Sequence, residues 1–142
     1  MSSITLRIIA SDTAEALIAT ALRHAADSGW QVAAAVVDPS GQLIAFRRMD
    51  RAIAPAGDFA CDKAWTAATL GKSSRVWGAR VLASDTLRAG HGNRPRLMTW
   101  GGGVAVFEDG ICIGGLGVSG AQEDEDILCA ETAIRAQGLT PG

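Results

Sequence analysis

Two pairs of short apolar segments, each joined by a tight turn, constrain the fold of this chain more than any other feature. The first pair is 32–37 and 43–49, and the second pair is 104–107 and 111–113. The intervening turns contain Pro39 and Gly41 in the first case and Asp109-Gly110 in the second. These residues supply the backbone angles of tight turns, so each pair is predicted to form a β-hairpin.

Helical segments separate and follow the hairpins. Apolar residues recur at helical spacing between Ala14 and Ala25, and Gly29 is expected to end this amphipathic helix. Further helices are expected over 58–70, 75–82 and 123–136, a first strand over 4–9 and a loop over 88–96. This order predicts a single α+β domain over residues 1–142, a largely antiparallel sheet with flanking helices.

Composition argues against two classes of partner. The net charge is −2, and no basic cluster exceeds the pair Arg47-Arg48, whereas nucleic-acid binders normally carry a basic stripe. No apolar stretch approaches the ~20 residues of a membrane span, and the N-terminus lacks a signal-peptide pattern. We therefore expect no nucleic-acid or membrane partner and a cytoplasmic location. Cys61, Cys112 and Cys129 are expected to be free, small apolar side chains.

Five short motifs carry a family resemblance, at 36–41, 48–50, 63–67, 101–103 and 114–120. In this order they resemble the GlcG/HbpS family, which also occurs as the C-terminal domain of PduO-type proteins. The resemblance implies a profilin-like fold with a five-stranded sheet, and assembly as a homo-oligomer. It also implies haem as a cofactor of some members, while other members degrade haem, act as sensors or have no assigned activity.

Four polar residues match the family motifs directly: Asp38, Arg48, Asp50 and Lys63. We expect Asp38, Arg48 and Asp50 to bind the ligand, although Asp50 could instead form a structural ion pair with Lys63 or Arg48. Lys63 lies in an Ala-rich helix, which brings its backbone close to whatever the helix packs on. It could bind a carboxylate such as a haem propionate, or act as an acid/base group if burial lowers its pKa.

Glycines supply a second set of candidates. Gly117 and Ser119 are expected to contribute to ligand binding, because backbone N–H groups of the turn before a helix N-terminus can receive an anion. Gly102 and Gly103 are expected to do so because they match a motif of the family. A tight strand-to-helix turn with a β-bulge explains the glycines of 114–120 without a ligand. The acidic run 123–126 favours this second interpretation, since it satisfies the helix dipole itself.

Four residues depart from the family pattern: Arg51, Ala105, Leu128 and Glu131. Glu131 falls on the same helical face as Ile127 and Ile134, where burial should raise its pKa and make it a candidate catalytic residue. Lys63 is the expected partner of Glu131, either as a second catalytic group or as a structural counter-charge.

Only two histidines are present, His24 and His91. His24, at the flank of the first helix, is the better candidate to ligate haem iron, because a helix holds an imidazole more rigidly than a Gly-rich loop. A surface-exposed His24 is the alternative. Two imidazoles exclude a multi-histidine metal site within one chain, although symmetry could complete one.

Two functional hypotheses follow. The first is a small-ligand-binding protein that holds haem or another compact anionic metabolite near an oligomer interface. The second is an enzyme, an acid/base isomerase, lyase or hydrolase, that acts on a small metabolite through Lys63 and Glu131. No nucleophile elbow, Rossmann fingerprint or P-loop is present. The sequence favours the binding protein.

Overall fold

The two hairpins join into one antiparallel sheet in the computed structural model, which describes residues 1–142. The first hairpin pairs β1 (Ala33–Val37) with β2 (Leu43–Arg48), and the second pairs β3 (Gly103–Glu108) with β4 (Ile111–Ser119). β1 also pairs with β4, and the strand order is β2-β1-β4-β3-β5. The predicted α+β fold with a five-stranded antiparallel sheet is confirmed.

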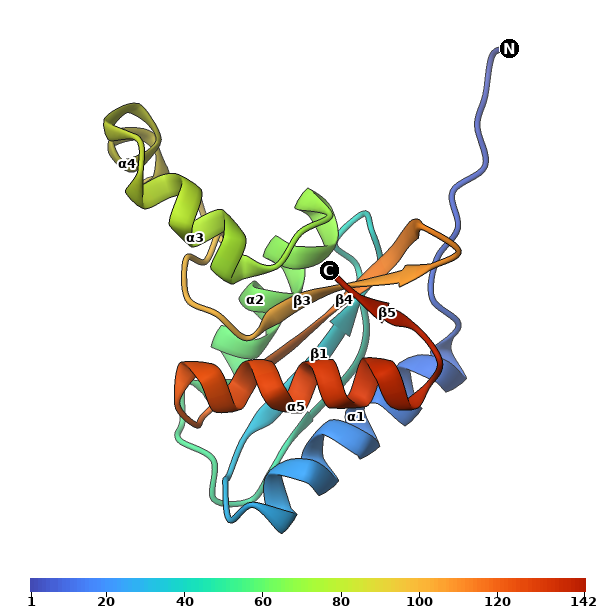
Figure 1. Ribbon diagram of the computed structural model, residues 1–142, viewed down its shortest axis with the longest axis vertical. Coiled ribbons are helices and arrows are strands. Elements are labelled where there is room, and N and C mark those ends of the chain that lie inside the picture. The colour runs from blue at the N-terminus through green and yellow to red at the C-terminus, as the bar shows by residue number, and fades with distance from the viewer.

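Helices cover both faces of this sheet (Figure 1). α1 (Ser11–Asp27) and α5 (Glu123–Ala136) lie on one face, and α2 (Ala56–Leu70) lies on the other. β1 lies between the two layers: Ala34 and Val36 belong to the larger core cluster beneath α1 and α5, whereas Ala33 and Ala35 pack with the alanines of α2. A strand buried on both faces is continuously apolar, which explains the apolar run at this position in the sequence.

The predicted strand over 4–9 is wrong. This segment is an extended coil in which Ile4, Leu6 and Ile8 are exposed, and one backbone bond joins the Ile9 N–H to the Ile113 carbonyl. The fifth strand is instead β5 (Thr140–Pro141), which pairs with β3 after α5 ends. An alternating apolar pattern forms a strand only where a neighbouring strand is free to pair.

Two further helices, α3 (Ser74–Leu82) and α4 (Asp85–His91), form an arm that projects from the body (Figure 1). α4 contradicts the loop expected from residue 88 onward. Ser84 caps this helix, because its hydroxyl accepts a hydrogen bond from the Leu87 N–H at 3.2 Å. A strong N-cap thus outweighs the helix-breaking tendency of Gly90 near the other end.

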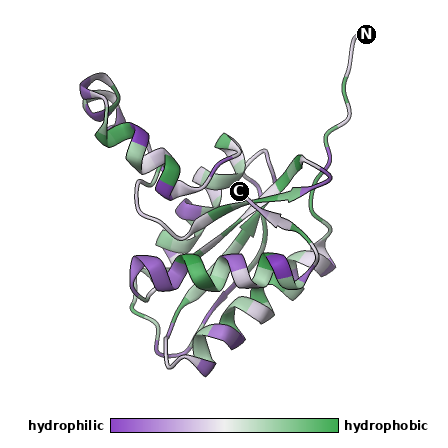
Figure 2. Ribbon diagram, viewed as in Figure 1, coloured by the Kyte–Doolittle hydropathy of each residue, from purple (hydrophilic) through white to green (hydrophobic).

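Hydropathy follows the layers (Figure 2). The central strands are coloured as hydrophobic, while α1 and α5 alternate between hydrophilic and hydrophobic residues along their length. None of the five helices combines the length and the apolar content that crossing a bilayer requires.

Candidate functional site

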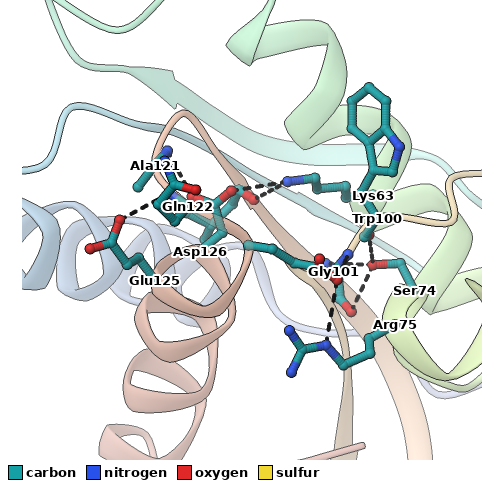
Figure 3. Close-up of polar contacts among 12 residues, drawn as sticks. Lys63, Ser74, Arg75, Trp100, Gly101, Ala121, Gln122, Glu125 and Asp126 are labelled. Carbon is teal, nitrogen blue, oxygen red and sulfur yellow. Dashed lines mark hydrogen bonds and ion pairs between the residues drawn. The ribbon is translucent and has the colours of Figure 1, made fainter.

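Lys63 lies in the middle of α2 with its side chain only 3% exposed. Its Nζ donates to the Val118 carbonyl and to Oδ2 of Asp126, both at 3.1 Å (Figure 3). α2 can approach β4 closely because Gly117 has no side chain. A Cβ at that position would lie 2.1 Å from the Ala60 carbonyl oxygen. The predicted close approach of the Ala-rich helix therefore buries its lysine.

Asp126, in the first turn of α5, is the partner of Lys63. Its carboxylate is as buried as the amine, and Oδ1 accepts a hydrogen bond from the Ala121 N–H at 3.0 Å. The two side chains thereby join α2, the end of β4, the turn that follows β4 and α5. Burial holds the pKa of Lys63 below and that of Asp126 above the usual range, and mutual attraction opposes both shifts.

The segment Gly101–Gly103 covers the lysine. Gly102 has φ +124°, and a Cβ there would lie 2.5 Å from the Val118 carbonyl oxygen and 2.9 Å from Lys63 Nζ. The Ser74 hydroxyl accepts from the Gly103 N–H at 2.9 Å and fixes one end of the segment. Glu123 Oε1 accepts from the Gly101 N–H at 2.8 Å and fixes the other end (Figure 3). The ion pair is therefore closed off from solvent.

This arrangement indicates a structural role for the pair, which joins α2 to β4 and α5. A catalytic lysine must reach its substrate, and neither member of the pair lines any of the five most prominent cavities. Gly102, Gly103 and Gly117 surround the pair, and Ser119 is buried just beyond Val118. The structure thus brings Gly102 and Gly103 against Lys63 and Gly117 against the neighbouring turn of α2, where the absence of side chains allows close packing.

Glu131 does not belong to this group, and its expected pairing with Lys63 is wrong. Its side chain is 34% exposed, and Oε2 accepts from Arg135 Nη1 at 3.2 Å, one helical turn away. Asp126 occupies the buried position facing Lys63, and Glu131 lies five residues farther along α5. The catalytic pair of the enzyme hypothesis is not assembled.

Asp38 also lies away from Lys63. Its Oδ1 accepts hydrogen bonds from the N–H groups of Ser40 at 2.7 Å and Gln42 at 3.1 Å, which closes the β1–β2 turn. This turn follows Val37, at the opposite end of β1 from Ala33, the residue that pairs with Ser119. Asp38 therefore shapes the hairpin.

A groove opens where α1 passes over the edge strand β2. Its volume is about 750 Å³, within the 300–1,000 Å³ typical of ligand sites. We call it the α1–β2 groove. It is lined by Ser11, Glu15, Ile18, Ala19, Ile44, Ala45, Phe46 and Arg47. Most of these residues are apolar, and Arg47 and Glu15 supply one charge of each sign.

A second hollow adjoins this groove and shares Arg47 with it. We call it the arginine hollow; it has a volume of about 360 Å³ and is lined by Gln31, Arg47, Arg48, Met49, Asp50 and Arg51. No ion pair involves any of its three arginines. The expected ion pairs of Asp50 with Lys63 or Arg48 are absent, so Arg48 and Asp50 are pocket-lining residues.

His24 lies on another face of α1. Its ring packs edge-on against Trp30, with the ring centroids 6.0 Å apart, and its Nε2 is buried without a hydrogen-bond partner. The imidazole lines neither the groove nor the hollow. No three His, Cys, Asp or Glu side chains are grouped to hold a metal ion, and all three cysteines are free.

The sequence interpretation missed Asp126 and the grouping of Arg47 with Arg51. Asp126 was hidden in an acidic run typical of a solvated first helical turn. Its spacing could have indicated its burial, because Cys129 and Ala130 follow Asp126 at i+3 and i+4 and all three share the buried face of α5. The sequence Arg47-Arg48 followed by Arg51 was the corresponding signal for the hollow.

Comparison with known proteins identifies the family. The family model for the haem-degrading protein HbpS and its relatives matches residues 9–135. The chain belongs to this HbpS-like family. PduO, the corrinoid adenosyltransferase of Salmonella typhimurium, is 34% identical over 106 residues, which are 74% of this chain but 32% of PduO. The chain thus spans about a third of that relative. Protein GlcG of Escherichia coli is 34% identical over 112 residues, covering 79% of this chain and 81% of GlcG.

Solved structures of the HbpS-like type share the whole fold. The Klebsiella pneumoniae protein ORFY has a TM-score of 0.91 and 27% identity, over 97% of this chain and 96% of ORFY. A complex of PduOC with haem has a TM-score of 0.85 and 28% identity, over 93% of this chain and 96% of PduOC. The resemblance to the GlcG/HbpS family is confirmed.

Proposed function

We propose that this HbpS-like chain binds a flat, largely apolar ligand that carries acidic groups, and that haem is this ligand. One observation carries the proposal: the apolar α1–β2 groove and the arginine hollow adjoin at Arg47. Haem has the matching chemistry, an apolar ring with carboxylates at one side. The complex of the related PduOC with haem supports this choice of ligand.

The arginines would hold the acidic groups. Arg47, Arg48 and Arg51 form no ion pairs within the chain, so their guanidinium groups are free to make charge-assisted hydrogen bonds with carboxylates. Phe46 and Ile18 line the apolar part, where the ring would displace water. Since the groove runs along the edge strand, a second copy of the chain would close its open side.

His24 is the candidate iron ligand. Its buried, unpartnered Nε2 fits this role, because an imidazole nitrogen without a hydrogen bond can coordinate a metal. It lies about 120° around α1 from Ile18, however, by the helical period. The groove itself offers iron no histidine, cysteine or methionine. His24 would therefore reach the iron of a haem in the groove only from a second copy of the chain.

A haem titration followed by the Soret band tests the proposal. Arg47→Gln should weaken binding by tenfold or so, as expected from the loss of one charge-assisted hydrogen bond. Arg23→Gln, at an exposed arginine of α1 that lines neither cavity, is the matched control and should bind like the unmodified protein.

Three other results would contradict parts of the proposal. No Soret shift in the unmodified protein would reject haem. Unchanged affinity in Arg47→Gln would reject the groove as the site. A band lost in His24→Ala but intact in Arg47→Gln would move the site to the other face of α1.

A further inference from the structure

The α3–α4 arm differs from the other helices in how little it buries. No residue of α4 is buried, and α3 buries only Ser74, Gly78 and Val81. Figure 1 shows both helices standing away from the sheet. Helices of nine and seven residues are not stable through propensity alone, because short helices in water depend on tertiary packing. Additional burial by a partner would stabilise this arm.

One face of α3 is suited to such a contact. Val76 is 56% exposed, and Ala79 and Ala83 follow it at i+3 and i+7, so three apolar residues share the outer face. Arg80, one turn after Val76, borders this face and forms no ion pair. The face therefore presents an apolar strip beside a free positive charge.

Charge is distributed unevenly between the arm and the body. Residues 72–96 contain six of the 13 basic residues but only one of the 15 acidic residues. The arm region thus carries an excess of positive charge, and the remainder of the chain carries a larger excess of negative charge. Complementary potentials of this kind steer two proteins together and fix their orientation. A second copy of this chain offers the required negative surface.

The body has an open hollow with matching chemistry on the α2 face of β2. This β2–α2 hollow has a volume of about 580 Å³ and is lined by Leu43, Phe46, Arg48, Ala54, Gly57, Asp58 and Cys61. Leu43 and Phe46 are among the most exposed large apolar residues of the sheet. Asp58, in the first turn of α2, forms no ion pair and supplies the carboxylate of the hollow. Arg48, which the hollow shares with the arginine hollow, is its one cation, so the contact for Arg80 is Asp58 itself rather than the net charge of the lining.

We propose that the α3–α4 arm docks in the β2–α2 hollow of a second copy of this chain. Val76 enters the apolar lining, and Arg80 forms an ion pair with Asp58. Because the arm and the hollow lie on different parts of the surface, the contact closes either as a two-fold pair with reciprocal docking or as a ring. It covers the exposed apolar side of α3 and meets the α1–β2 groove at Phe46, the one residue that lines both cavities.

Charge reversal tests this docking by sedimentation equilibrium at micromolar concentration. We expect an oligomer that Arg80→Glu and Asp58→Lys each weaken by at least tenfold, since each variant places two like charges together. The double variant Arg80→Glu/Asp58→Lys restores the opposite charges and should recover most of the association. Arg23→Glu, at an unpaired arginine of α1, is the matched control and should leave association unchanged.

Amide hydrogen exchange gives an independent readout. Exchange in α4 should slow as the protein concentration rises, because docking stabilises the arm. A monomer at every concentration would overturn the proposal. It would also be overturned if the single variants associated normally, or if both weakened association without recovery in the double variant. If the chain were monomeric and bound to a heparin column, the arm would instead be a site for a polyanionic partner.

Discussion

The buried pair Lys63–Asp126 and the open arginine hollow contain similar chemical groups under opposite physical conditions. In the pair, both side chains are 3% exposed and neutralise each other at 3.1 Å. In the hollow, Arg47, Arg48 and Arg51 are exposed and have no ionic partner within the chain. A charge that is already paired inside the protein gains little from binding a ligand. An unpaired charge beside an apolar groove can still form an ion pair with a ligand.

The comparison teaches that burial separates the structural charges from those proposed to bind the ligand. Lys63 drew attention in the sequence because it is a charged residue in an Ala-rich helix. Its surroundings bury it. Gly117 lets α2 approach the sheet closely, and the glycines at 101–103 cover the amine. The arginines lie at the end of an edge strand, where neighbouring elements leave them accessible.

The largest effect should come from breaking the buried pair. Lys63→Met keeps the length of the side chain but leaves the Asp126 carboxylate buried without its counter-charge. We expect a loss of about 3–5 kcal/mol in the free energy of unfolding, as is typical when one partner of a buried pair is removed. Urea denaturation monitored by tryptophan fluorescence measures this loss.

The double variant Lys63→Met/Asp126→Asn is the matched control. Asparagine retains an oxygen that can accept from the Ala121 N–H but carries no charge. The double variant should therefore be more stable than Lys63→Met alone. A Lys63→Met variant that unfolds like the unmodified protein but binds haem more weakly would contradict the division between structural pair and binding hollow.

Local chemistry explains which elements of the fold could be predicted from the sequence. The hairpin turns at 38–41 and 108–110 depend on residues adjacent in the chain, and α5 was predicted with its exact bounds, Glu123–Ala136. The strand expected at 4–9 depended on a distant partner, and β5 took the edge position beside β3 instead. Pairing between remote segments cannot be deduced from one segment's pattern.

The site was less predictable than the fold for the same reason. Lys63, Gly102 and Gly103 were each singled out, because the motifs that contain them resemble those of a known family, but the sequence did not predict that they lie together. The partner of Lys63 was wrongly taken as Glu131, since both Glu131 and Asp126 lie on helical faces with apolar neighbours. A difference of five residues along α5 decides which carboxylate meets the lysine, and only the packing of α2 against α5 fixes that.

The buried thiol of Cys129 should have an intermediate effect on the free energy of unfolding, and this effect depends on pH. Burial, assisted by the nearby Asp126, raises the pKa of its thiol to about 12, from 9.0 when unperturbed. The folded protein therefore keeps this proton between pH 9 and pH 12, while the unfolded chain loses it. Folding stability should fall as pH rises through this window, by up to about 1.4 kcal/mol per pH unit.

The measurement is the free energy of unfolding of the unmodified protein relative to Cys129→Ala, compared at pH 8 and pH 11. Taking the difference removes the contributions of the other titrating groups. Cys61→Ala is the matched control. The Cys61 thiol is less buried and its pKa is also raised by burial, so a smaller slope is expected. A difference that is independent of pH would show that the Cys129 thiol is open to solvent in the folded state.

The smallest effect is expected at Glu131, which lies between the two extremes. It is partly exposed, and its ion pair with Arg135 spans one turn of a helix surface. Such pairs contribute about 0.3–0.5 kcal/mol, so Glu131→Gln should change the free energy of unfolding by no more than this. Arg135→Gln removes the same pair from the other side and should give a similar value. Haem affinity should be unaffected in both variants, because neither residue lines the α1–β2 groove or the arginine hollow. A loss of several kcal/mol in Glu131→Gln would mean that this carboxylate is buried against a partner, and a loss of haem binding would extend the ligand site to α5.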